Sequence, residues 1–253
     1  MLGTLTRAGA VLDLFTLEEP EWGVTATAHR LGIGKSLAHD VLTSLAAIGL
    51  LQRVGHGRYR LGWRTVTLAA VVLRTSEVKA HARPVVRDLA ERQGMTVSLV
   101  AWDRGRIIYI DRRYCARQAN GSRANGCGPA AGTAAPLDGS AASKVLLASR
   151  TRNEVNLLWG DGLVHTSHAS VDELELELER IRLHGWAEND VGKTHGSTAV
   201  AAPVRDAQGT VAAAISLDLR DPFSSANVNH HARAVVAAAS RISAAIRHHA
   251  LAA

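Results

Sequence analysis

The amino-acid sequence predicts an α+β protein with two domains joined by a helix. Helical periodicity followed by a glycine-centred β-hairpin fills residues 1–62, which indicates a small domain of helices and a hairpin. Short strands and helices alternate over residues 80–253, which indicates a larger domain with a mainly antiparallel sheet. Residues 63–79 lie between these patterns and are expected to form a linker helix. The composition, 47% hydrophobic and 21% charged, is typical of globular proteins.

Three helices are expected in the first domain. Apolar residues at helical spacing predict them over Leu5–Leu17, Thr25–Leu31 and Lys35–Ile48. The second and third are separated by Gly32-Ile33-Gly34, and glycine suits a tight corner between crossed helices. Gly49 ends the third helix, as glycine commonly does. A helix-turn-helix is therefore predicted.

A basic hairpin follows these helices. Two short β-like runs within Leu50–Leu61 flank Gly55-His56-Gly57, and this order of elements is that of a winged helix-turn-helix. Between Trp22 and Arg64 there are six Lys or Arg residues against one acid, Asp40, which accounts for most of the chain's net charge of +6. Such a cluster favours double-stranded DNA as a partner, because it neutralises phosphates. The alternative is a winged-helix module that binds a different partner.

The third helix and the hairpin supply the candidate DNA contacts. Lys35 and Ser36 begin the helix and are expected to meet phosphates or base edges. His39 either reads a base or is solvated, and Arg58 is expected to contact a phosphate. The full set comprises exposed polar positions of both elements: Lys35, Ser36, His39, Asp40, Thr43, Arg53, His56, Arg58 and Arg60.

Apolar residues continue through the linker and the second domain. Val72 and Leu73 make the linker helix too apolar for a free spacer, so we expect it to pack on another subunit, on the N-terminal domain or in a core within the chain. Further helices are expected over Ala80–Gln93, Gly139–Arg150, Val171–His184 and Asn229–His249. Strands are expected over Thr96–Trp102, Arg106–Asp111, Ala199–Val204 and Thr210–Asp218, with a loop that ends in a strand over Tyr114–Pro136.

Six motifs follow one another along the chain: GKS (34–36), AAIGLLQR (46–53), GRYRLG (57–62), APLDGSAASKVLLA (135–148), IRLHGWA (181–187) and VAAPVRDAQGTVAAAIS (200–216). Their order and spacing give the chain a resemblance to the IclR-type transcriptional regulators over nearly its whole length. The resemblance implies a GAF-like effector-binding domain, a homodimer or dimer of dimers, and operators near the regulated genes.

The effector site is expected where a helix start and a strand face meet. Gly139-Ser140 opens a helix whose backbone N–H groups can hold an anion, and Ser216 and Asp218 share one face of a strand. The resemblance places a second pocket wall between Trp186 and Ala199. The candidate effector-binding residues are Gly139, Ser140, Ala141, Asn189, Asp190, His195, Ser197, Ala199, Ser216 and Asp218.

The chain also differs from the family pattern inside these motifs. Ser143-Lys144 stands where Gly-Lys is common, Ala199 where Cys or Ser is common, and Asp218 where a second Ser is common. Asp40 occupies a position of the recognition helix that is frequently Arg, and an acid there can accept from a cytosine amino group or remain solvated. Amino acids, aromatic acids and small metabolic acids all remain open as effectors.

Other function classes find little support. Ser140, His195 and Asp218 are an imaginable hydrolase triad, but no G-x-S-x-G elbow surrounds any serine. The histidines lack a metal-binding pattern, and Cys115 and Cys127 form neither a zinc cluster nor a disulfide framework, so no metal, cofactor or catalysis is expected. We expect no membrane span or signal peptide, hence a cytoplasmic chain. A ligand-independent structural DNA-binding protein is the alternative to an effector-controlled regulator.

Overall fold

The computed structural model describes residues 3–113, 130–189, 198–219 and 225–252. The chain divides into two compact units, Met1–Thr75 and Ser76–Ala253. The predicted α+β class is confirmed, with helices and a small sheet in the first unit and a larger, mainly antiparallel sheet in the second.

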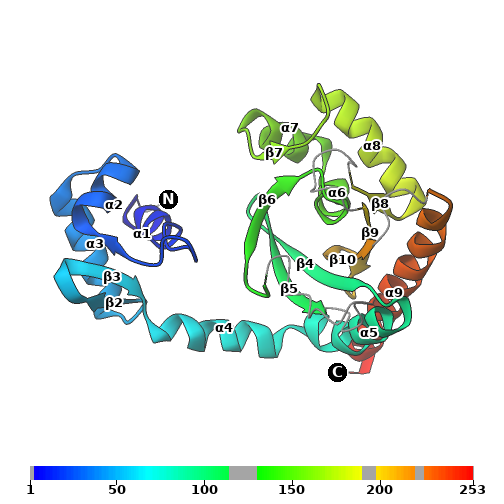
Figure 1. Cartoon of the computed structure of the whole chain (residues 1–253), viewed down its shortest axis with the longest axis horizontal. Coiled ribbons are helices and arrows are strands. Elements are labelled where there is room, and N and C mark those ends of the chain that lie inside the picture. The colour runs from blue at the N-terminus through cyan, green and yellow to red at the C-terminus, as the bar shows by residue number, and fades with distance from the viewer. Residues whose placement is uncertain (1–2, 114–129, 190–197, 220–224, 253) are drawn as a thin grey trace, which may run out of the picture. The chain divides into compact units, whose positions relative to one another are not determined.

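The N-terminal unit is a winged helix-turn-helix, as predicted (Figure 1). Its strands form one antiparallel sheet in the order β1-β3-β2, and the β2–β3 hairpin is the wing. Its elements are α1 (Gly3–Leu12), β1 (Trp22–Gly23), α2 (Val24–Leu31), α3 (Lys35–Ala47), β2 (Leu51–Val54), the 3-10 turn η1 (Gly55–Gly57), β3 (Arg58–Leu61) and α4 (Trp63–Thr75).

The core of this unit is formed by one stripe of α3 together with α1 and the wing. The buried core residues are Val11, Val41, Leu42, Leu45, Leu51 and Tyr59. Half of the surface of Ile48, the last residue of the predicted third helix, is exposed. The helix ends at Ala47 and the chain reverses at Gly49, whose φ is 77°, so Ile48 leaves the helical periodicity. The first helix also ends at Leu12, five residues earlier than predicted.

The C-terminal unit contains a seven-stranded sheet in the order β7-β6-β5-β4-β10-β9-β8. Its described pairs are antiparallel except β6–β7. The elements are α5 (Glu77–Gln93), β4 (Thr96–Asp103), β5 (Arg106–Arg113), β6 (Ala134–Asp138), α6 (Ala141–Ala148), α7 (Arg152–Gly160), β7 (Val164–His165), α8 (Val171–His184), β8 (Ala187–Glu188), β9 (Thr198–Arg205), β10 (Val211–Leu219) and α9 (Ser225–Ala252).

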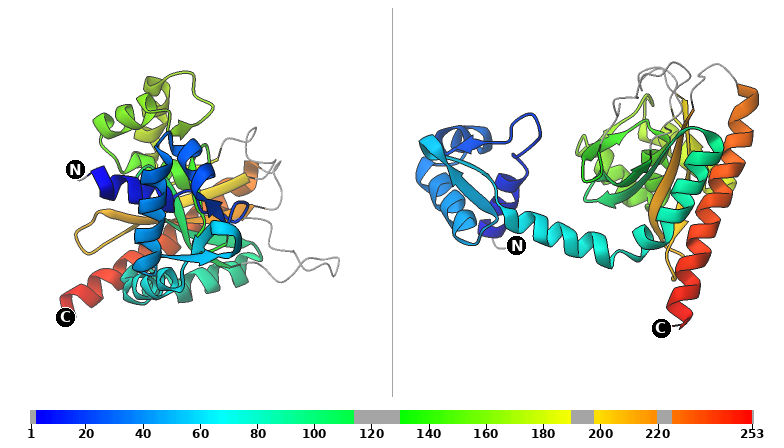
Figure 2. Two further views of the ribbon diagram at one scale, coloured as in Figure 1. Left: turned by 90° about the vertical axis from the view of Figure 1, so that its left-hand side faces the viewer. Right: turned by 60° about the horizontal axis from the view of Figure 1, so that its bottom comes forward.

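Helices cover both faces of this sheet. Helices α5 and α9 contact each other and pack on one face, which we call the outer face (Figure 2). Helices α6 and α8 pack on the opposite, inner face. Because side chains alternate along a strand, Ile215 and Leu217 of β10 flank Ser216 but point to the outer face, whereas Ser216 and Asp218 point to the inner face. This confirms the shared face that the sequence predicted for these two residues.

Helix caps account for two differences from the sequence prediction. The Ser76 hydroxyl accepts a hydrogen bond from the Lys79 backbone N–H, so α5 begins at Glu77, three residues before its predicted start. Helix α7 was not predicted, and the reciprocal Thr151–Glu154 capping box begins it. Among the described helices, none combines the length and apolar character that a bilayer crossing requires.

Candidate DNA-binding surface and effector site

All nine predicted DNA-contacting side chains are exposed. In α3 the buried positions are Ala38, Val41, Leu42 and Leu45, and this stripe turns the predicted positions of the helix to the solvent. Arg53 lies on β2, His56 in η1, and Arg58 and Arg60 on β3. The local geometry thus presents one helix and one wing, as DNA-binding winged helices do.

Some of these side chains already have partners within the unit. The Arg58 guanidinium donates to the Glu21 carbonyl oxygen at 2.8 Å, and its Nε lies 3.5 Å from the Glu21 carboxylate. Arg60 donates to the Gln52 side chain at 3.4 Å. His39 Nδ1 lies 3.6 Å from Asp40 Oδ1, so these neighbours form a polar pair on the exposed surface of α3. Exposed ion pairs of this kind contribute little to stability, and DNA phosphates can compete for the cations.

The inner face of the C-terminal sheet holds a polar cluster that the sequence prediction found only in part. Strand pairing aligns Arg112, Ser98 and Ser216 across β5, β4 and β10. The Arg112 side chain extends past this row, and its Nη2 donates to Asp218 Oδ2 at 3.0 Å. The Arg112 side chain is 8% exposed and that of Asp218 is 35% exposed. The carboxylate is therefore the more accessible half of the pair.

Burial changes the pKa values of two members of this cluster. Burial raises the pKa of Asp218, and the Arg112 guanidinium partly opposes this shift. Burial also raises the pKa of Tyr109, whose ring lies 5.7 Å from the Arg112 guanidinium carbon. Tyr109, Arg112 and Ser98 were not predicted. Ser98 lies in a predicted strand, but its partner across the sheet follows only from the strand register.

The start of α6 is occupied by its own side chains. Asp138 Oδ1 accepts from the Ser140 backbone N–H at 3.1 Å and from the Ser143 hydroxyl at 2.9 Å. The Ser140 hydroxyl in turn accepts from the Ser143 backbone N–H at 3.3 Å. The N–H groups of Ser140 and Ser143 are therefore already bonded, and an anion placed at this end would meet the Asp138 carboxylate.

The second predicted wall lies only partly within the described residues. Asn189 is buried, its side-chain oxygen accepts from the Ala199 N–H at 2.7 Å, and its N–H donates to the Ala199 carbonyl at 3.1 Å. Asn189 thus bridges to the start of β9. Asp190, His195 and Ser197 lie outside the described residues, as do Cys115 and Cys127.

Lys144 is a buried residue of α6. Its Nζ donates to Glu177 Oε1 at 2.9 Å and to the Glu188 carbonyl at 3.2 Å. His168 Nε2 lies 2.8 Å from the other carboxylate oxygen of Glu177. This cluster joins α6 to α8 and to the segment between β7 and α8. No group of three potential metal ligands occurs within the described part of the chain.

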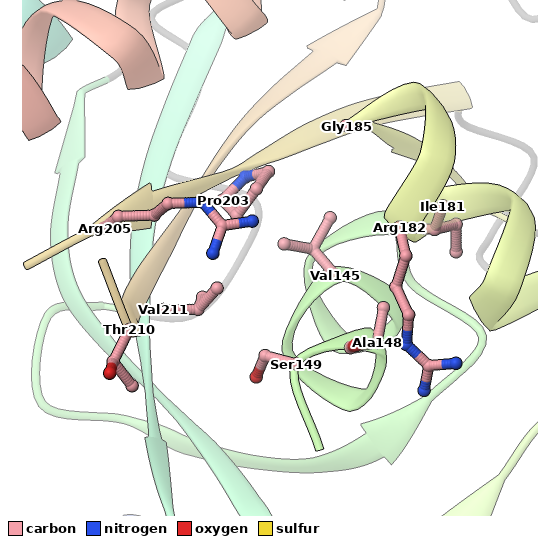
Figure 3. A pocket seen from close by; sticks show the side chains of 10 residues that line it. All are labelled: Val145, Ala148, Ser149, Ile181, Arg182, Gly185, Pro203, Arg205, Thr210 and Val211. Atoms are coloured by element: carbon pink, nitrogen blue, oxygen red, sulfur yellow. Dashed lines mark hydrogen bonds between the residues drawn. The ribbon is translucent and has the colours of Figure 1, made fainter. Parts of the chain in front are cut away.

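A cavity of about 400 Å³ lies at the other end of α6 (Figure 3). It is bounded by the last turn of α6, the C-terminal end of α8 and the β9–β10 hairpin, and the described residues that line it include none of the predicted effector residues. Arg182, on one wall, donates to the carbonyls of Ala148 and Arg150 and to Glu175. That arginine is thereby fixed as a cap on the end of α6.

Comparisons with known proteins agree with both units. Residues 4–55 match the IclR helix-turn-helix domain, and residues 70–244 match the bacterial transcriptional regulator IclR C-terminal domain. The glycerol operon regulatory protein of Streptomyces griseus is 30% identical over 220 residues, which cover 85% of this chain and 83% of that protein.

Solved structures show the same fold. An IclR regulator from Alicyclobacillus acidocaldarius is 25% identical with a TM-score of 0.77, and the alignment covers 97% of this chain and 99% of that one. An IclR homologue from Microbacterium hydrocarbonoxydans, complexed with 4-hydroxybenzoate, is 22% identical with a TM-score of 0.71, over 96% of this chain and 99% of that one.

Proposed function

The chain belongs to the IclR family of bacterial transcriptional regulators, and from this premise we propose how it reads DNA and where it senses its effector. It is a DNA-binding regulator with a C-terminal ligand-binding domain. We propose that α3 and the β2–β3 wing contact the operator, and that a small molecule on the inner face of the C-terminal sheet controls operator affinity. Since operator DNA is its target, we propose that it acts in the cytoplasm.

Exposure of the predicted contacts on α3 and the wing is the observation that carries the DNA proposal. Lys35 and Ser36 begin α3, where the helix dipole favours a phosphate. His39, Asp40 and Thr43 follow along the exposed side of the helix, and we propose that they face base edges. The basic residues of the wing then supply phosphate contacts, with Arg58 exchanging Glu21 for DNA.

The effector proposal is supported by the change from apolar to polar side chains along the inner face. Toward one end this face is apolar, with Val100 and Ala214 paired and buried. Toward the other end it carries Ser216, Asp218 and Arg112. Polar groups on a mostly apolar face are typical of small-molecule sites. The homologue that binds 4-hydroxybenzoate supports an organic molecule of this size, an organic acid or amino acid, as the effector class.

We also propose that the chain works as a homodimer or dimer of dimers. Helix α4 has no buried residue, and its apolar Trp63, Val66, Val71 and Val72 are each more than half exposed. Burying such a surface against a second copy is favourable, at about 25 cal/mol per Å² of apolar area. A Val71→Glu substitution is then expected to shift the sedimentation coefficient toward that of the monomer. Two winged helices in a dimer would meet half-sites about 34 Å apart, or a multiple of that distance.

The alternative functions are less well supported. Of the imagined hydrolase triad, Ser140 donates to the Ser143 hydroxyl and Asp218 pairs with Arg112, while His195 lies outside the described residues. The curated relatives are regulators rather than enzymes. A structural DNA-binding protein that binds no small molecule would not account for the polar side chains on the inner face.

Operator binding is the first test. The purified protein is titrated against the promoter DNA beside its own gene at several salt concentrations. We expect sequence-selective binding that weakens steeply with salt and that Lys35→Ala or Arg58→Ala weakens strongly. Arg87→Ala, on α5, is the control and should bind as the unaltered protein does. Binding that is indifferent to sequence would support the structural alternative.

Effector control is tested on the same complex. A ligand that binds the folded protein should raise its free energy of unfolding by RT ln(1 + [L]/Kd) and should also change operator affinity. Coupling between the two sites is reciprocal and typically amounts to about 1–3 kcal/mol. Equal operator affinity with and without a saturating, independently verified ligand would contradict effector control.

A further inference from the structure

The polar end of the inner face contains more negative than positive charge among the described residues. Arg112, Asp138 and Asp218 all lie within electrostatic reach of Tyr109: burial raises the pKa of this phenol, Arg112 opposes the shift, and the two carboxylates add to it. The described cluster therefore has two carboxylates and one guanidinium. Asp138 is fixed in place by its bonds to Ser140 and Ser143.

This balance of charge restricts the ligand. A simple carboxylic acid that approaches Arg112 would add a third carboxylate to Asp138 and Asp218, against Arg112 as the one cation of the cluster within the described residues. Like charges in such a setting disfavour one another strongly, and each unpaired buried charge carries a desolvation penalty. A ligand that carries an ammonium group together with its carboxylate adds no net charge to the cluster.

We infer that the effector is a zwitterion of the amino-acid type, whose carboxylate binds Arg112 and whose ammonium group binds Asp218. This inference rests on the proposed function, which places the effector on the inner face. In the Arg112–Asp218 pair a cation and an anion lie side by side, with 3.0 Å between Nη2 and Oδ2. A bound amino acid presents the complementary pair, an anion beside a cation.

Asp218 can bind an ammonium group without leaving Arg112. The bond between them uses one carboxylate oxygen of Asp218, and a carboxylate accepts from several donors at once. The 35% exposure of the Asp218 side chain leaves that carboxylate accessible to an ammonium group.

The neighbouring surface fits an apolar side chain on the ligand. Tyr109 and Ala199 are partly buried and pack against the inner-face core; Tyr109 lies on β5 with Arg112, and Ala199 of β9 pairs with Asp218. They can contact hydrocarbon while the ligand's charged groups meet Arg112 and Asp218. The class is therefore an amino acid with an aliphatic or aromatic side chain.

Matched sets of compounds test the inference on the full-length protein. Leucine is compared with 4-methylpentanoate, which lacks the ammonium group, and with 3-methylbutylamine, which lacks the carboxylate. Phenylalanine, 3-phenylpropanoate and 2-phenylethylamine form a second set, and the other common amino acids are screened by thermal unfolding. We expect at least one amino acid to bind, by calorimetry, at least tenfold more tightly than both of its truncated forms. Equal or tighter binding of the acid, or stabilisation by none of the amino acids, would overturn the inference.

Variants then locate the specificity. Asp218→Ser should reduce the preference for the amino acid over its des-amino acid at least tenfold, because it removes the partner of the ammonium group. Asp218→Asn, which is nearly isosteric, repeats the test if the serine variant unfolds. Asp172→Ser is the matched control: Asp172, on α8, is exposed and pairs with Arg152 of α7 at 2.6 Å, so the preference should persist. An unchanged preference in the Asp218 variants would overturn the assignment.

Failure of the inference and failure of the proposed function have different signatures. A protein that binds its operator and is released by a simple carboxylic acid remains a sensor but not a sensor of zwitterions. A protein that does not bind the operator contradicts the proposed function, whatever its affinity for amino acids.

Discussion

The backbone of Gly62 lies so close to Gly49 that a Cβ at position 62 would come within 2.3 Å of the Gly49 carbonyl oxygen. The Gly62 N–H also donates to the Leu50 carbonyl at 2.8 Å, which ties the end of the wing to the turn after α3. Because the atoms that this Cβ would meet belong to the backbone of Gly49 and Leu51, a Gly62→Ala substitution must shift the wing or the turn. We expect it to destabilise the N-terminal unit by about 1–3 kcal/mol and to weaken operator binding.

Gly55→Ala is the control for this substitution. A Cβ there meets no atom within 4 Å, and the residue lies in the same hairpin. Chemical denaturation of both variants, together with operator titration, measures the two effects. A Gly62→Ala variant as stable as Gly55→Ala would show that the wing and the turn move apart at little cost.

The wing arginines set the salt dependence of DNA binding. Arg53 and Arg60 are exposed on the neighbouring strands β2 and β3, where each is expected to neutralise a phosphate. Replacing either with alanine should make the slope of log affinity against log salt shallower by about 0.9, the value for one phosphate that is no longer neutralised. Fluorescence anisotropy at several salt concentrations measures the slope. The same slope in both variants and in the unaltered protein would exclude Arg53 and Arg60 from phosphate binding.

Asp40 should affect sequence preference rather than salt dependence. Its carboxylate is exposed on α3 beside His39, and an acid there repels phosphates while it can accept from a cytosine amino group. We expect Asp40→Asn to bind unrelated DNA more tightly and to discriminate less between operator variants. Selection from a randomised operator library measures the preference. An unchanged selected sequence would indicate that Asp40 is a solvated residue.

Breaking the buried ion pair of Lys144 should destabilise the C-terminal unit more than removing both of its members. Lys144→Met leaves the Glu177 carboxylate with His168 as its described partner, and loss of one partner of a buried pair typically costs about 3–5 kcal/mol. We expect a loss near the lower end of this range. The double variant Lys144→Met/Glu177→Leu should be more stable than the single variant by chemical denaturation. A double variant that is less stable would show that the polar network is needed as a whole.

Local patterns predicted much of the fold, because helical and strand periodicity are properties of short segments. The recognition helix and the inner-face position of Ser216 and Asp218 followed in this way. Arg112 did not, because a β-bulge decides its orientation: Val100 pairs with Tyr109 but Leu99 with Asp111, so Ile110 is the extra residue. Simple alternation from Tyr109 would turn Asp111 inward, whereas the bulge turns Arg112 inward. The ion pair joins residues 106 positions apart, beyond any local pattern.

Acidity should weaken the packing of α9 on α5 through His231. Its Nδ1 lies 3.0 Å from the Gln93 side-chain oxygen, and burial, with a smaller contribution from His230, lowers the pKa of this imidazole below its ordinary value of 6.5. The folded state therefore binds fewer protons than the unfolded state between the lowered pKa and 6.5. Stability contributed by neutral His231 is complete above this window and is lost as the pH falls through it.

Replacing His231 tests this dependence directly. The free energy of unfolding of the unaltered protein should fall between about pH 7.5 and pH 5.5, and His231→Gln should reduce that fall because an amide does not titrate. His29→Gln, which removes an exposed histidine of α2, is the matched control and should retain the original dependence. If His231→Gln and the unaltered protein lose the same stability over this range, the effect of acid on the unit arises from other groups.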